Sequence, residues 1–346
     1  MKILITPNQL IKKLKSTDNI SKNIKKWRKI TSDIVNKKDS KLIVIVWPCS
    51  IHDTEEAIFY AKKLYKIRNN YPNLFLVMRC YLEKPRTNIG WKWFISDPNI
   101  DWSCDIEKGL KKSRKLLMAI NEMGIPVSTE FLNNITPNYI SDLITWWVIW
   151  ARTTESQIHR ELVSNLKCTI WYKNWTSWDI QIAIDAIKFS SNEHSFVWVN
   201  INWKTQIIKS TWNKNCHIIL RWWKNWTNYD ENNINDTISK LKVEKIKTWI
   251  MVDVSHANSQ KNPENQPKVI ERIASQIEIW NKEIIWVMIE SNIFSGCQTF
   301  LPWKDNIKNL KYWVSMTDWC ISFEETENVL SILNKAVEKR KTVTMN

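Results

Sequence analysis

Short runs of apolar, mostly β-branched residues alternate along this chain with longer stretches in which apolar residues recur every three or four positions. Eight of the short runs predict β-strands, at residues 42–47, 75–80, 126–130, 147–151, 169–173, 217–221, 250–254 and 284–289. Helical spacing lies between most of them, for example at 54–69, 105–123, 136–144, 179–189 and 264–280. Strands that alternate with helices predict an α/β fold, and eight of them predict a closed parallel barrel, the (β/α)8 or TIM barrel.

Two segments depart from this alternation. Residues 1–40 are rich in lysine and carry apolar residues at roughly helical spacing, which predicts an N-terminal helical arm before the barrel. Residues 194–213 contain two short apolar runs, 196–200 and 206–210, which predict a β-hairpin inserted between the fifth and sixth units. No internal repeat or linker divides the remainder, so we expect one barrel domain over residues 41–340.

Chemically active side chains stand at the ends of the predicted strands. The carboxyl ends of all barrel strands meet at one face, where barrel enzymes carry out their chemistry. Here the strand ends supply, in chain order, Cys49, Arg79, Glu130, Arg152, Lys173, Arg221, Asp253 with His256, and Glu290. Asp318 follows in the loop beyond the eighth strand, and the stretch from Glu83 to Thr87 follows the second. We therefore expect these residues to face one another.

Four of these residues form a set of metal ligands: Cys49, His256, Glu290 and Asp318. A thiolate, an imidazole and two carboxylates suit one divalent transition ion, namely Mn, Fe, Co or Zn, whereas structural zinc sites favour several cysteines. The alternative is that the thiol is a small buried hydrophobe, the histidine a core residue and the acids solvated.

A second set consists of cations, namely Arg79, Lys84, Arg86, Arg152, Lys173 and Arg221. Guanidinium groups bind phosphate and carboxylate through two parallel hydrogen bonds, and lysine adds a point charge. Six cations at one mouth would repel one another unless anions lie between them, so this set predicts anionic substrates. The alternative is that each cation pairs with a nearby acid such as Glu130 or Glu155.

Composition narrows the class of protein. The chain has 346 residues, and its longest apolar run, Ile144 to Ala151, is too short to cross a bilayer. Its start lacks the pattern of a signal peptide, and its seven cysteines are scattered without a CxxC pair. We therefore expect a cytoplasmic protein without a membrane partner. The net charge of +15 admits an anionic partner, but lysine is abundant throughout and no basic block carries interleaved aromatics, so no nucleic-acid partner is expected.

The proportions of glycine and tryptophan are abnormal. The chain has 4 Gly and 23 Trp, whereas ordinary proteins contain about 7% Gly. Many tryptophans stand in predicted turns, where glycine is the usual residue. Our hypothesis is that 21 of them are glycine in the natural protein, through a genetic code that reads UGA as glycine. Trp91 and Trp146 would remain tryptophan, with Trp27 undecided, and the alternative is a protein truly rich in tryptophan.

Motifs at the strand ends, in chain order, resemble those of one enzyme family. Residues 47–53 (WPCSIHD) resemble GPCSIHD, and 151–156 (ARTTES) resemble the end of GARTTES. Seven further stretches also resemble motifs of this family: 78–79 (MR), 83–87 (EKPRT), 90–93 (GWKW), 171–176 (WYKNWT), 217–223 (HIILRWW), 253–259 (DVSHANS) and 287–291 (VMIES). The family is the class I 3-deoxy-D-arabino-heptulosonate 7-phosphate (DAHP) synthases. The match runs from about residue 40 to 335, and nearly every departure is Trp in place of Gly.

The resemblance implies an activity and a role for each matched residue. The activity is condensation of phosphoenolpyruvate with D-erythrose 4-phosphate and water, releasing phosphate, as the first step of the shikimate pathway. By motif, Cys49, His256, Glu290 and Asp318 would hold the metal, and Arg79, Arg152, Lys173 and Arg221 would bind phosphoenolpyruvate. Lys84, Pro85, Arg86 and Thr87 would bind erythrose 4-phosphate, with Lys84, Cys49 and His256 at the reacting centre.

The resemblance also implies a homo-oligomer, a dimer or tetramer, with feedback regulation by an aromatic amino acid. Leu162, Leu166, Phe196 and Trp198 fall on positions that would line the effector site. If Trp198 is glycine, the extra room favours tyrosine over phenylalanine. Lys167 departs from the small residue expected there, which puts feedback sensitivity in doubt.

Two other functions stay open. The first is 3-deoxy-octulosonate 8-phosphate synthase, which shares the barrel and phosphoenolpyruvate, although the stretch from Lys84 to Thr87 suits a four-carbon phosphate better. The second is a non-catalytic basic binding protein derived from the barrel, although the complete ligand and cation sets argue against decay.

Overall fold

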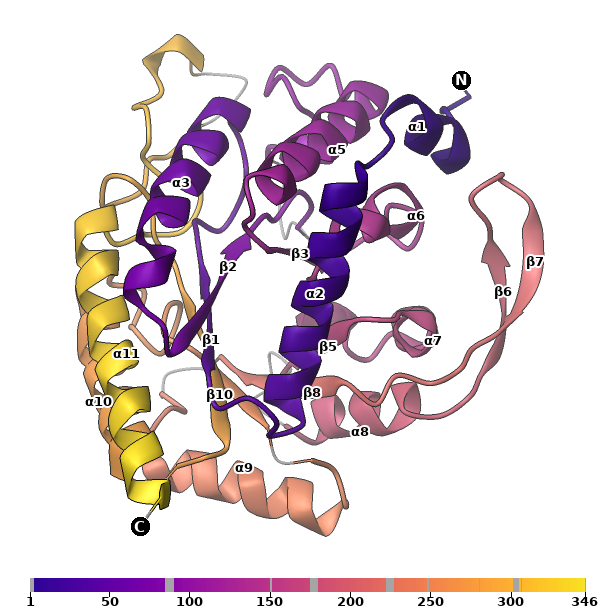
Figure 1. Cartoon of the computed structure of the whole chain (residues 1–346). Coiled ribbons are helices and arrows are strands. Elements are labelled where there is room, and N and C mark those ends of the chain that lie inside the picture. The colour runs from indigo at the N-terminus through magenta and orange to yellow at the C-terminus, as the bar shows by residue number, and fades with distance from the viewer. Residues whose placement is uncertain are drawn as a thin grey trace.

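The computed structural model describes residues 3–84, 90–149, 151–174, 180–221, 227–247, 249–279, 281–300, 305 and 307–345. Eight parallel strands close into a barrel in the order β1-β10-β9-β8-β5-β4-β3-β2 (Figure 1). They are β1 (Leu42–Val46), β2 (Leu74–Arg79), β3 (Val127–Phe131), β4 (Trp146–Ile149), β5 (Thr169–Lys173), β8 (Cys216–Leu220), β9 (Ile250–Asp253) and β10 (Ile284–Ile289). The predicted (β/α)8 barrel is confirmed, and each strand begins within one residue of its predicted start.

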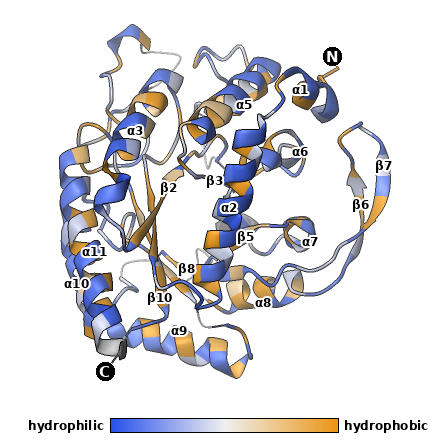
Figure 2. Ribbon diagram, viewed as in Figure 1, coloured by the Kyte–Doolittle hydropathy of each residue, from blue (hydrophilic) through white to orange (hydrophobic). Residues whose placement is uncertain are grey.

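Helices follow the strands and surround the sheet. The longer ones are α3 (Thr54–Ile67), α5 (Ile106–Glu122), α7 (Gln157–Asn165), α8 (Gln181–Ser190), α9 (Glu231–Val243), α10 (Asn265–Ile279) and α11 (Phe323–Met345). Shorter turns are α4 (Trp93–Ser96), α6 (Pro137–Ile140), η1 (Arg68–Asn70), η2 (Ser141–Leu143), η3 (Ala151–Thr153) and η4 (Ile307–Asn309). Apolar strands lie inside a ring of helices whose outer faces are polar (Figure 2). Covering both faces of the sheet explains why its strands are near-continuous apolar runs.

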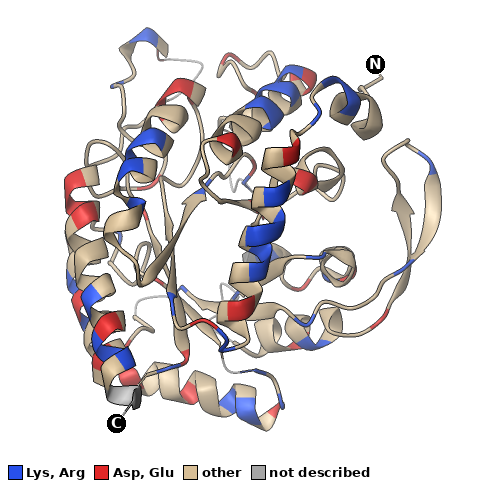
Figure 3. Cartoon of the chain, viewed as in Figure 1, with Lys and Arg blue, Asp and Glu red and all other residues tan. Residues whose placement is uncertain are grey.

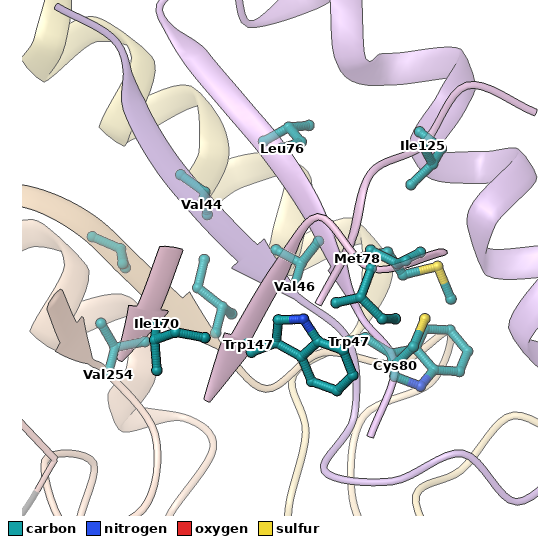
Figure 4. Close-up of a cluster of buried hydrophobic side chains, with 14 of the residues drawn as sticks. Val44, Val46, Trp47, Leu76, Met78, Cys80, Ile125, Trp147, Ile170 and Val254 are labelled. Carbon is teal, nitrogen blue, oxygen red and sulfur yellow. The ribbon is translucent and has the colours of Figure 1, made fainter. Parts of the chain in front are cut away.

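Alternation along the strands divides the core into two clusters. On β1, Val44 and Val46 point outward into the layer between sheet and helices, where they lie near Leu76 and Met78 of β2 (Figure 4). Ile43 and Ile45 belong instead to the cluster inside the barrel, together with Val77, Met251, Met288 and three tryptophans, Trp146, Trp171 and Trp286. Because side chains alternate with a period of two, every second residue of each strand points inward.

The N-terminal arm forms two helices, α1 (Pro7–Lys13) and α2 (Asp18–Val35). Ile34 and Val35 at the end of α2 belong to the same cluster as the residues inside the barrel. The Arg28 guanidinium donates hydrogen bonds to the carbonyls of Ser141 and Ile144, fixing α2 against η2. The arm therefore closes the end of the barrel at which the strands begin, and the opposite end is left for chemistry.

A two-stranded antiparallel sheet, β6 (Ser195–Val199) and β7 (Thr205–Lys209), projects from the barrel between α8 and β8 (Figure 1). Its strands start one residue before the predicted ones. The backbone amide of Asn8 in α1 donates to the carbonyl of Ile201 at the tip of this hairpin. Val197 and Ile207 remain largely exposed on it. The hairpin therefore carries apolar surface away from the barrel.

Charged side chains of both signs are mixed on the outer helices (Figure 3). Within the described residues, no helix is long and apolar enough to cross a membrane.

Among the tryptophans that the structure describes, six have backbone dihedrals in the left-handed region. They are Trp47, Trp93, Trp102, Trp203, Trp212 and Trp313, with φ values from 62° to 141°. A bulky residue at positive φ is a conformational outlier, since its Cβ approaches the neighbouring carbonyl. The indole nitrogens of Trp146, Trp171 and Trp286 are buried without a hydrogen-bond partner among the described residues.

Candidate active site

The alternation of the strands brings the predicted site residues to the carboxyl-terminal mouth of the barrel. On five strands the residue two positions before the site residue lies inside the barrel: Val77 before Arg79, Trp171 before Lys173, Ile219 before Arg221, Met251 before Asp253, and Met288 before Glu290. A step of two residues keeps the same face of a strand. These charged side chains therefore continue the inner column of each strand to its mouth, and all five are at most partly exposed.

The four predicted metal ligands meet at this mouth. Cys49 follows β1, His256 follows β9, Glu290 follows β10, and Asp318 lies in the loop before α11. One ligand atom from each residue lies within 4.8 Å of those of the other three. The His256 Nε2 atom is 3.4 Å from Glu290 Oε1 and 3.5 Å from Asp318 Oδ2. Residues separated by up to 269 positions in the sequence thus present their donor atoms to one small volume.

The donor set fits a divalent transition ion. It combines a soft thiol sulfur, an imidazole nitrogen and two carboxylate oxygens, three of them on rigid strand ends. The Lys84 ammonium already brings one positive charge to this donor set, because it contacts Cys49 Sγ and lies 3.1 Å from Asp318 Oδ2. Burial lowers the pKa of Lys84, but the charges of Asp318, Cys49 and Glu290 together outweigh burial and leave that pKa raised. The electrostatics of this pocket therefore favour a cation.

His256 is held by its surroundings on both ring nitrogens. Its Nδ1 lies 3.0 Å from Asp253 Oδ2 and 2.8 Å from Ser255 Oγ. Burial and the nearby Arg221 lower the pKa of His256, but Glu290 and Asp253 outweigh them and raise it to about 10. The imidazole is thus directed toward the acids through Nε2 and held from behind through Nδ1.

The cations next to this cluster are paired with acids. Arg79 Nη2 lies 2.9 Å from Glu290 Oε1, and its guanidinium stacks over Tyr81 at 4.2 Å. Lys173 Nζ lies 2.5 Å from Glu130 Oε1, and both side chains are at most 2% exposed. Arg221 Nε lies 3.5 Å from Asp253 Oδ2. Each of these three cations therefore has an acidic partner, as our alternative interpretation of the cation set anticipated.

These cations also influence one another. The pKa of Lys173 is lowered to about 8. Burial is the largest cause, Arg221 and Arg79 also lower this pKa, and Glu130 raises it. Arg79, Lys173 and Arg221 therefore share one electrostatic environment beside the metal-ligand cluster. Arg152 lies in η3 after β4, with its side chain exposed.

The other predicted site residues lie elsewhere. Pro85, Arg86 and Thr87 fall outside the described residues. Leu162 is buried on α7 and Leu166 is half-buried directly after it. Phe196 and Trp198 lie on β6 with their ring centroids 6.1 Å apart.

Two polar residues directly after Cys49 have local structural contacts. His52 Nε2 lies 3.2 Å from Glu56 Oε2, and burial lowers the pKa of His52 to about 4. The Asp53 carboxylate caps α3 by accepting hydrogen bonds from the amides of Glu55 and Glu56. An Asp followed by Thr-Glu-Glu before an apolar helix is a capping pattern that the sequence displays.

Sequence reasoning gave no role to Asp253 or Tyr81, and it named Glu130 only in the alternative, as an acid with which a cation would pair. Asp253, Glu130 and Tyr81 are all at most 2% exposed and contact the predicted cations or His256. For Asp253 and Glu130 the signal was their position at strand ends. For Tyr81, which follows β2, no sequence pattern distinguished it from a core residue.

Comparison with known proteins points to one enzyme family. Residues 14–331 match the family model described as the DAHP synthetase I family. The chain is 42% identical to the tyrosine-inhibited phospho-2-dehydro-3-deoxyheptonate aldolase of Candida albicans, with 98% of this chain and 93% of that one covered. It is 40% identical to the Phe-sensitive enzyme of the same name from Escherichia coli, with 99% and 96% covered.

A solved structure supports the same relationship. The phospho-2-dehydro-3-deoxyheptonate aldolase from Francisella tularensis superimposes with a TM-score of 0.94 at 42% identity, and the match covers 98% of each chain. Since the family model matches most of the sequence and relatives about 40% identical span nearly all of it, the chain belongs to the DAHP synthetase I family.

Proposed function

We propose that this protein condenses phosphoenolpyruvate with D-erythrose 4-phosphate and water to give 3-deoxy-D-arabino-heptulosonate 7-phosphate and phosphate. The observation that carries the proposal is the four-residue donor cluster beside Lys84 and three acid-paired cations, two of them buried, at one barrel mouth. A binding module would have no need for both a metal-ligand set and a lysine against it. The relatives named above carry a corresponding enzyme name.

The cations would bind the two anionic groups of phosphoenolpyruvate. Arg79, Lys173 and Arg221 surround one volume, and each is held in place by a carboxylate: Glu290, Glu130 and Asp253, respectively. Such pairing lets cations stand close together before the substrate arrives, so that little reorganisation is needed on binding. Arg152 would complete this set from η3, and Lys84, Pro85, Arg86 and Thr87 would bind erythrose 4-phosphate.

Cys49, His256, Glu290 and Asp318 would hold a divalent ion. When bound, such an ion supplies Lewis-acid polarisation of the aldehyde. Lys84 would act beside it as a hydrogen-bond donor, since its raised pKa keeps the ammonium protonated at neutral pH. Its contacts with Cys49 and Asp318 support this role, because they bring the ammonium to the ligands of the ion that would polarise the aldehyde.

The bonds of the reaction balance as follows. C3 of phosphoenolpyruvate forms a bond to the aldehyde carbon of erythrose 4-phosphate, and the carbonyl electron pair becomes an alkoxide that takes a proton. Water adds to C2, giving a phosphorylated hemiketal after loss of a proton. The C2–O bond to phosphate then breaks, which leaves a ketone and inorganic phosphate. Arg79, Lys173 and Arg221 would stabilise the phosphate as it leaves.

The test is phosphate release by the protein purified from its own organism. We expect release that requires both substrates, stops with a chelator and returns on adding Mn²⁺, Fe²⁺, Co²⁺ or Zn²⁺. Arabinose 5-phosphate serves as the control aldehyde, because it is the substrate of the octulosonate synthases. Activity with arabinose 5-phosphate in place of erythrose 4-phosphate would overturn the substrate assignment, and no release with either would overturn the function.

The proposal includes the glycine hypothesis for the tryptophan positions. Six tryptophans at positive φ support it, because left-handed backbone costs an L-residue about 1–2 kcal/mol and costs glycine almost nothing. Trp47 is the sharpest example: it follows β1 directly, has φ 141° and is buried beside the loop that carries Cys49. Glycine at this turn would present the thiol without strain.

Packing inside the barrel supports the same proposal. The rings of Trp146, Trp171 and Trp286 pack together with centroids 4.7–6.1 Å apart, and the buried N–H groups of the two that would be glycine, Trp171 and Trp286, have no described partner. An unsatisfied buried donor costs about 1–3 kcal/mol. If Trp171 and Trp286 are glycine, Trp146 is the only one of these three indoles that the barrel interior has to hold. Trp91 differs, since its N–H donates to the carbonyl of Asp97 at 2.8 Å.

Intact and peptide mass spectrometry of the natural protein tests the hypothesis. We expect a mass well below 41.3 kDa, with glycine at the 21 positions and tryptophan at Trp91 and Trp146. A mass of 41.3 kDa would overturn it.

We extend the proposal to assembly and regulation. The exposed apolar hairpin suits a contact between copies of the chain in a dimer or tetramer, and we propose a cytoplasmic location. Feedback by tyrosine, or by phenylalanine, would act through Leu162, Leu166, Phe196 and position 198. Titration with the three aromatic amino acids tests this regulation. If none of the three reduces phosphate release, the proposed regulation is contradicted.

A further inference from the structure

We propose that Asp253 is a positioning residue that holds the metal-ligand imidazole of His256 and the cationic side chain of Arg221 in fixed positions relative to each other. This inference rests on the proposed function and adds to the pairing of Asp253 with Arg221 a second role, toward the metal ligand His256. Asp253 is the last residue of β9, and its side chain is completely buried.

The carboxylate of Asp253 lies between the two groups. Its Oδ2 is 3.0 Å from His256 Nδ1 and 3.5 Å from Arg221 Nε. A single oxygen thus faces one ring nitrogen of a predicted metal ligand and the guanidinium of a predicted phosphate ligand. Any movement of this oxygen changes both contacts at once.

The carboxylate is itself fixed by its neighbours. Its Oδ1 accepts hydrogen bonds from the amide of Ser255 at 3.1 Å and from Ser255 Oγ at 2.6 Å. The backbone carbonyl of Asp253 accepts a further bond from Asn258 Nδ2 at 2.8 Å. With Oδ1 engaged in this local turn, Oδ2 is left to face His256 and Arg221.

The imidazole is constrained from the backbone as well. His256 has φ 58°, a left-handed conformation that is uncommon for histidine. Its carbonyl accepts hydrogen bonds from the Lys261 amide at 2.6 Å and from Ser259 Oγ at 3.1 Å, which hold that conformation. The ring therefore reaches the acids of the cluster from a backbone conformation that these bonds hold, and its Nδ1 lies against Asp253 Oδ2 and Ser255 Oγ.

A carboxylate on the side of the imidazole away from the metal keeps the ring proton on the nitrogen that faces the carboxylate. The nitrogen near the metal then becomes a better ligand. In this chain the near nitrogen is Nε2, which faces Glu290 and Asp318. The same carboxylate orients Arg221 toward the substrate pocket. Asp253 therefore links metal affinity to phosphoenolpyruvate affinity, although it would contact neither.

The test replaces this carboxylate by its neutral isostere in Asp253→Asn. Titration with Co²⁺, followed by the visible absorption of the thiolate-bound ion, measures metal affinity independently of activity. We expect a loss of about 10–100-fold, the usual effect of removing such a partner, together with a raised KM for phosphoenolpyruvate. Glu130→Gln is the matched control, because it changes the Lys173 pair and should leave the Co²⁺ affinity unchanged.

A second variant covers the case in which Asp253→Asn does not fold, as judged by circular dichroism. Ser255→Ala removes the hydrogen bond from Ser255 Oγ to Asp253 Oδ1 and also the contact of that hydroxyl with His256 Nδ1, so it loosens the same assembly of carboxylate and imidazole and should weaken Co²⁺ binding. Wild-type Co²⁺ affinity in folded Asp253→Asn, or in Ser255→Ala if the first variant is unfolded, would overturn the inference. If the wild-type protein makes no product but Asp253→Asn still lowers the Co²⁺ affinity, the positioning role is supported and the proposed function is refuted. The two failures are therefore distinguishable.

Discussion

The buried pair of Lys173 and Glu130 predicts how activity depends on pH. Lys173 must be protonated to bind the anionic substrate, and its pKa in the protein without substrate is lowered to about 8, mainly by burial. A lysine with a lowered pKa is charged below that value and neutral above it. We therefore expect kcat/KM for phosphoenolpyruvate to fall as the pH rises through about 8, because kcat/KM reports groups of the free enzyme.

Glu130→Gln sets the magnitude of the effect. The carboxylate raises the lysine pKa through a 2.5 Å contact between two almost completely buried side chains. A hydrogen bond to a charged group is worth about 1.5–3 kcal/mol, and about 1.4 kcal/mol corresponds to one pKa unit. Removing the charge should therefore lower the Lys173 pKa by about 1–2 units and shift the descending limb to lower pH by the same amount.

The assay is kcat/KM for phosphoenolpyruvate from phosphate release, measured from pH 6 to pH 10 (roughly the range spanning the expected pKa values). Lys173→Arg is the control, because a guanidinium stays protonated throughout and should remove the limb. If Glu130→Gln leaves the limb where the wild type has it, or moves it to higher pH, the assignment of the limb to this pair is wrong.

Three further predictions follow from the site and the backbone. Cys49→Ala should abolish metal-dependent phosphate release and Co²⁺ binding while keeping the fold, and full retained activity would refute the ligand assignment. In the chain with tryptophan at position 203, Trp203→Gly should raise the free energy of unfolding in urea by about 1 kcal/mol, since it relieves φ 62° at a partly exposed turn. Trp91→Gly should lower that free energy by about 3–5 kcal/mol. Equal effects of the two substitutions would contradict the hypothesis that position 203 is naturally glycine and position 91 tryptophan. Asp142→Asn should lower the free energy of unfolding by about 1–2 kcal/mol, because it removes one of the two 2.7 Å hydrogen bonds from buried Arg114 and the negative charge of the pair. The exposed pair of Asp236 and Lys240 provides the control, because Asp236→Asn should leave stability unchanged.

The fold was predictable because both of its periods are visible in the sequence. Continuous apolar runs such as Leu42–Val46 specify strands buried on two faces, and the strand ends carry the charged residues. The period of two then determines which residues point inward, so the convergence of Cys49, His256 and Glu290 could be expected before the structure. The hairpin was predictable from its two short runs for the same reason.

Contacts between distant residues were not predictable in the same way. Nothing in the sequence shows that Glu130 approaches Lys173, or that Asp253 rather than another acid stands behind His256. Those pairings depend on the strand order and on the depth of each residue in the barrel mouth. His52 illustrates the converse, since it lies three residues from Cys49 in the sequence but the structure pairs it with Glu56 on α3.

The central claim is that this barrel mouth joins phosphoenolpyruvate to erythrose 4-phosphate. Its most direct test is to incubate the protein from its own organism with both substrates and one divalent ion, and to identify the sugar phosphate formed by mass spectrometry. The account predicts a seven-carbon 3-deoxy-2-keto acid phosphate, formed in an amount equal to the phosphate released and absent after chelation. Phosphate release without this product, or no turnover with any of the four ions, would contradict it.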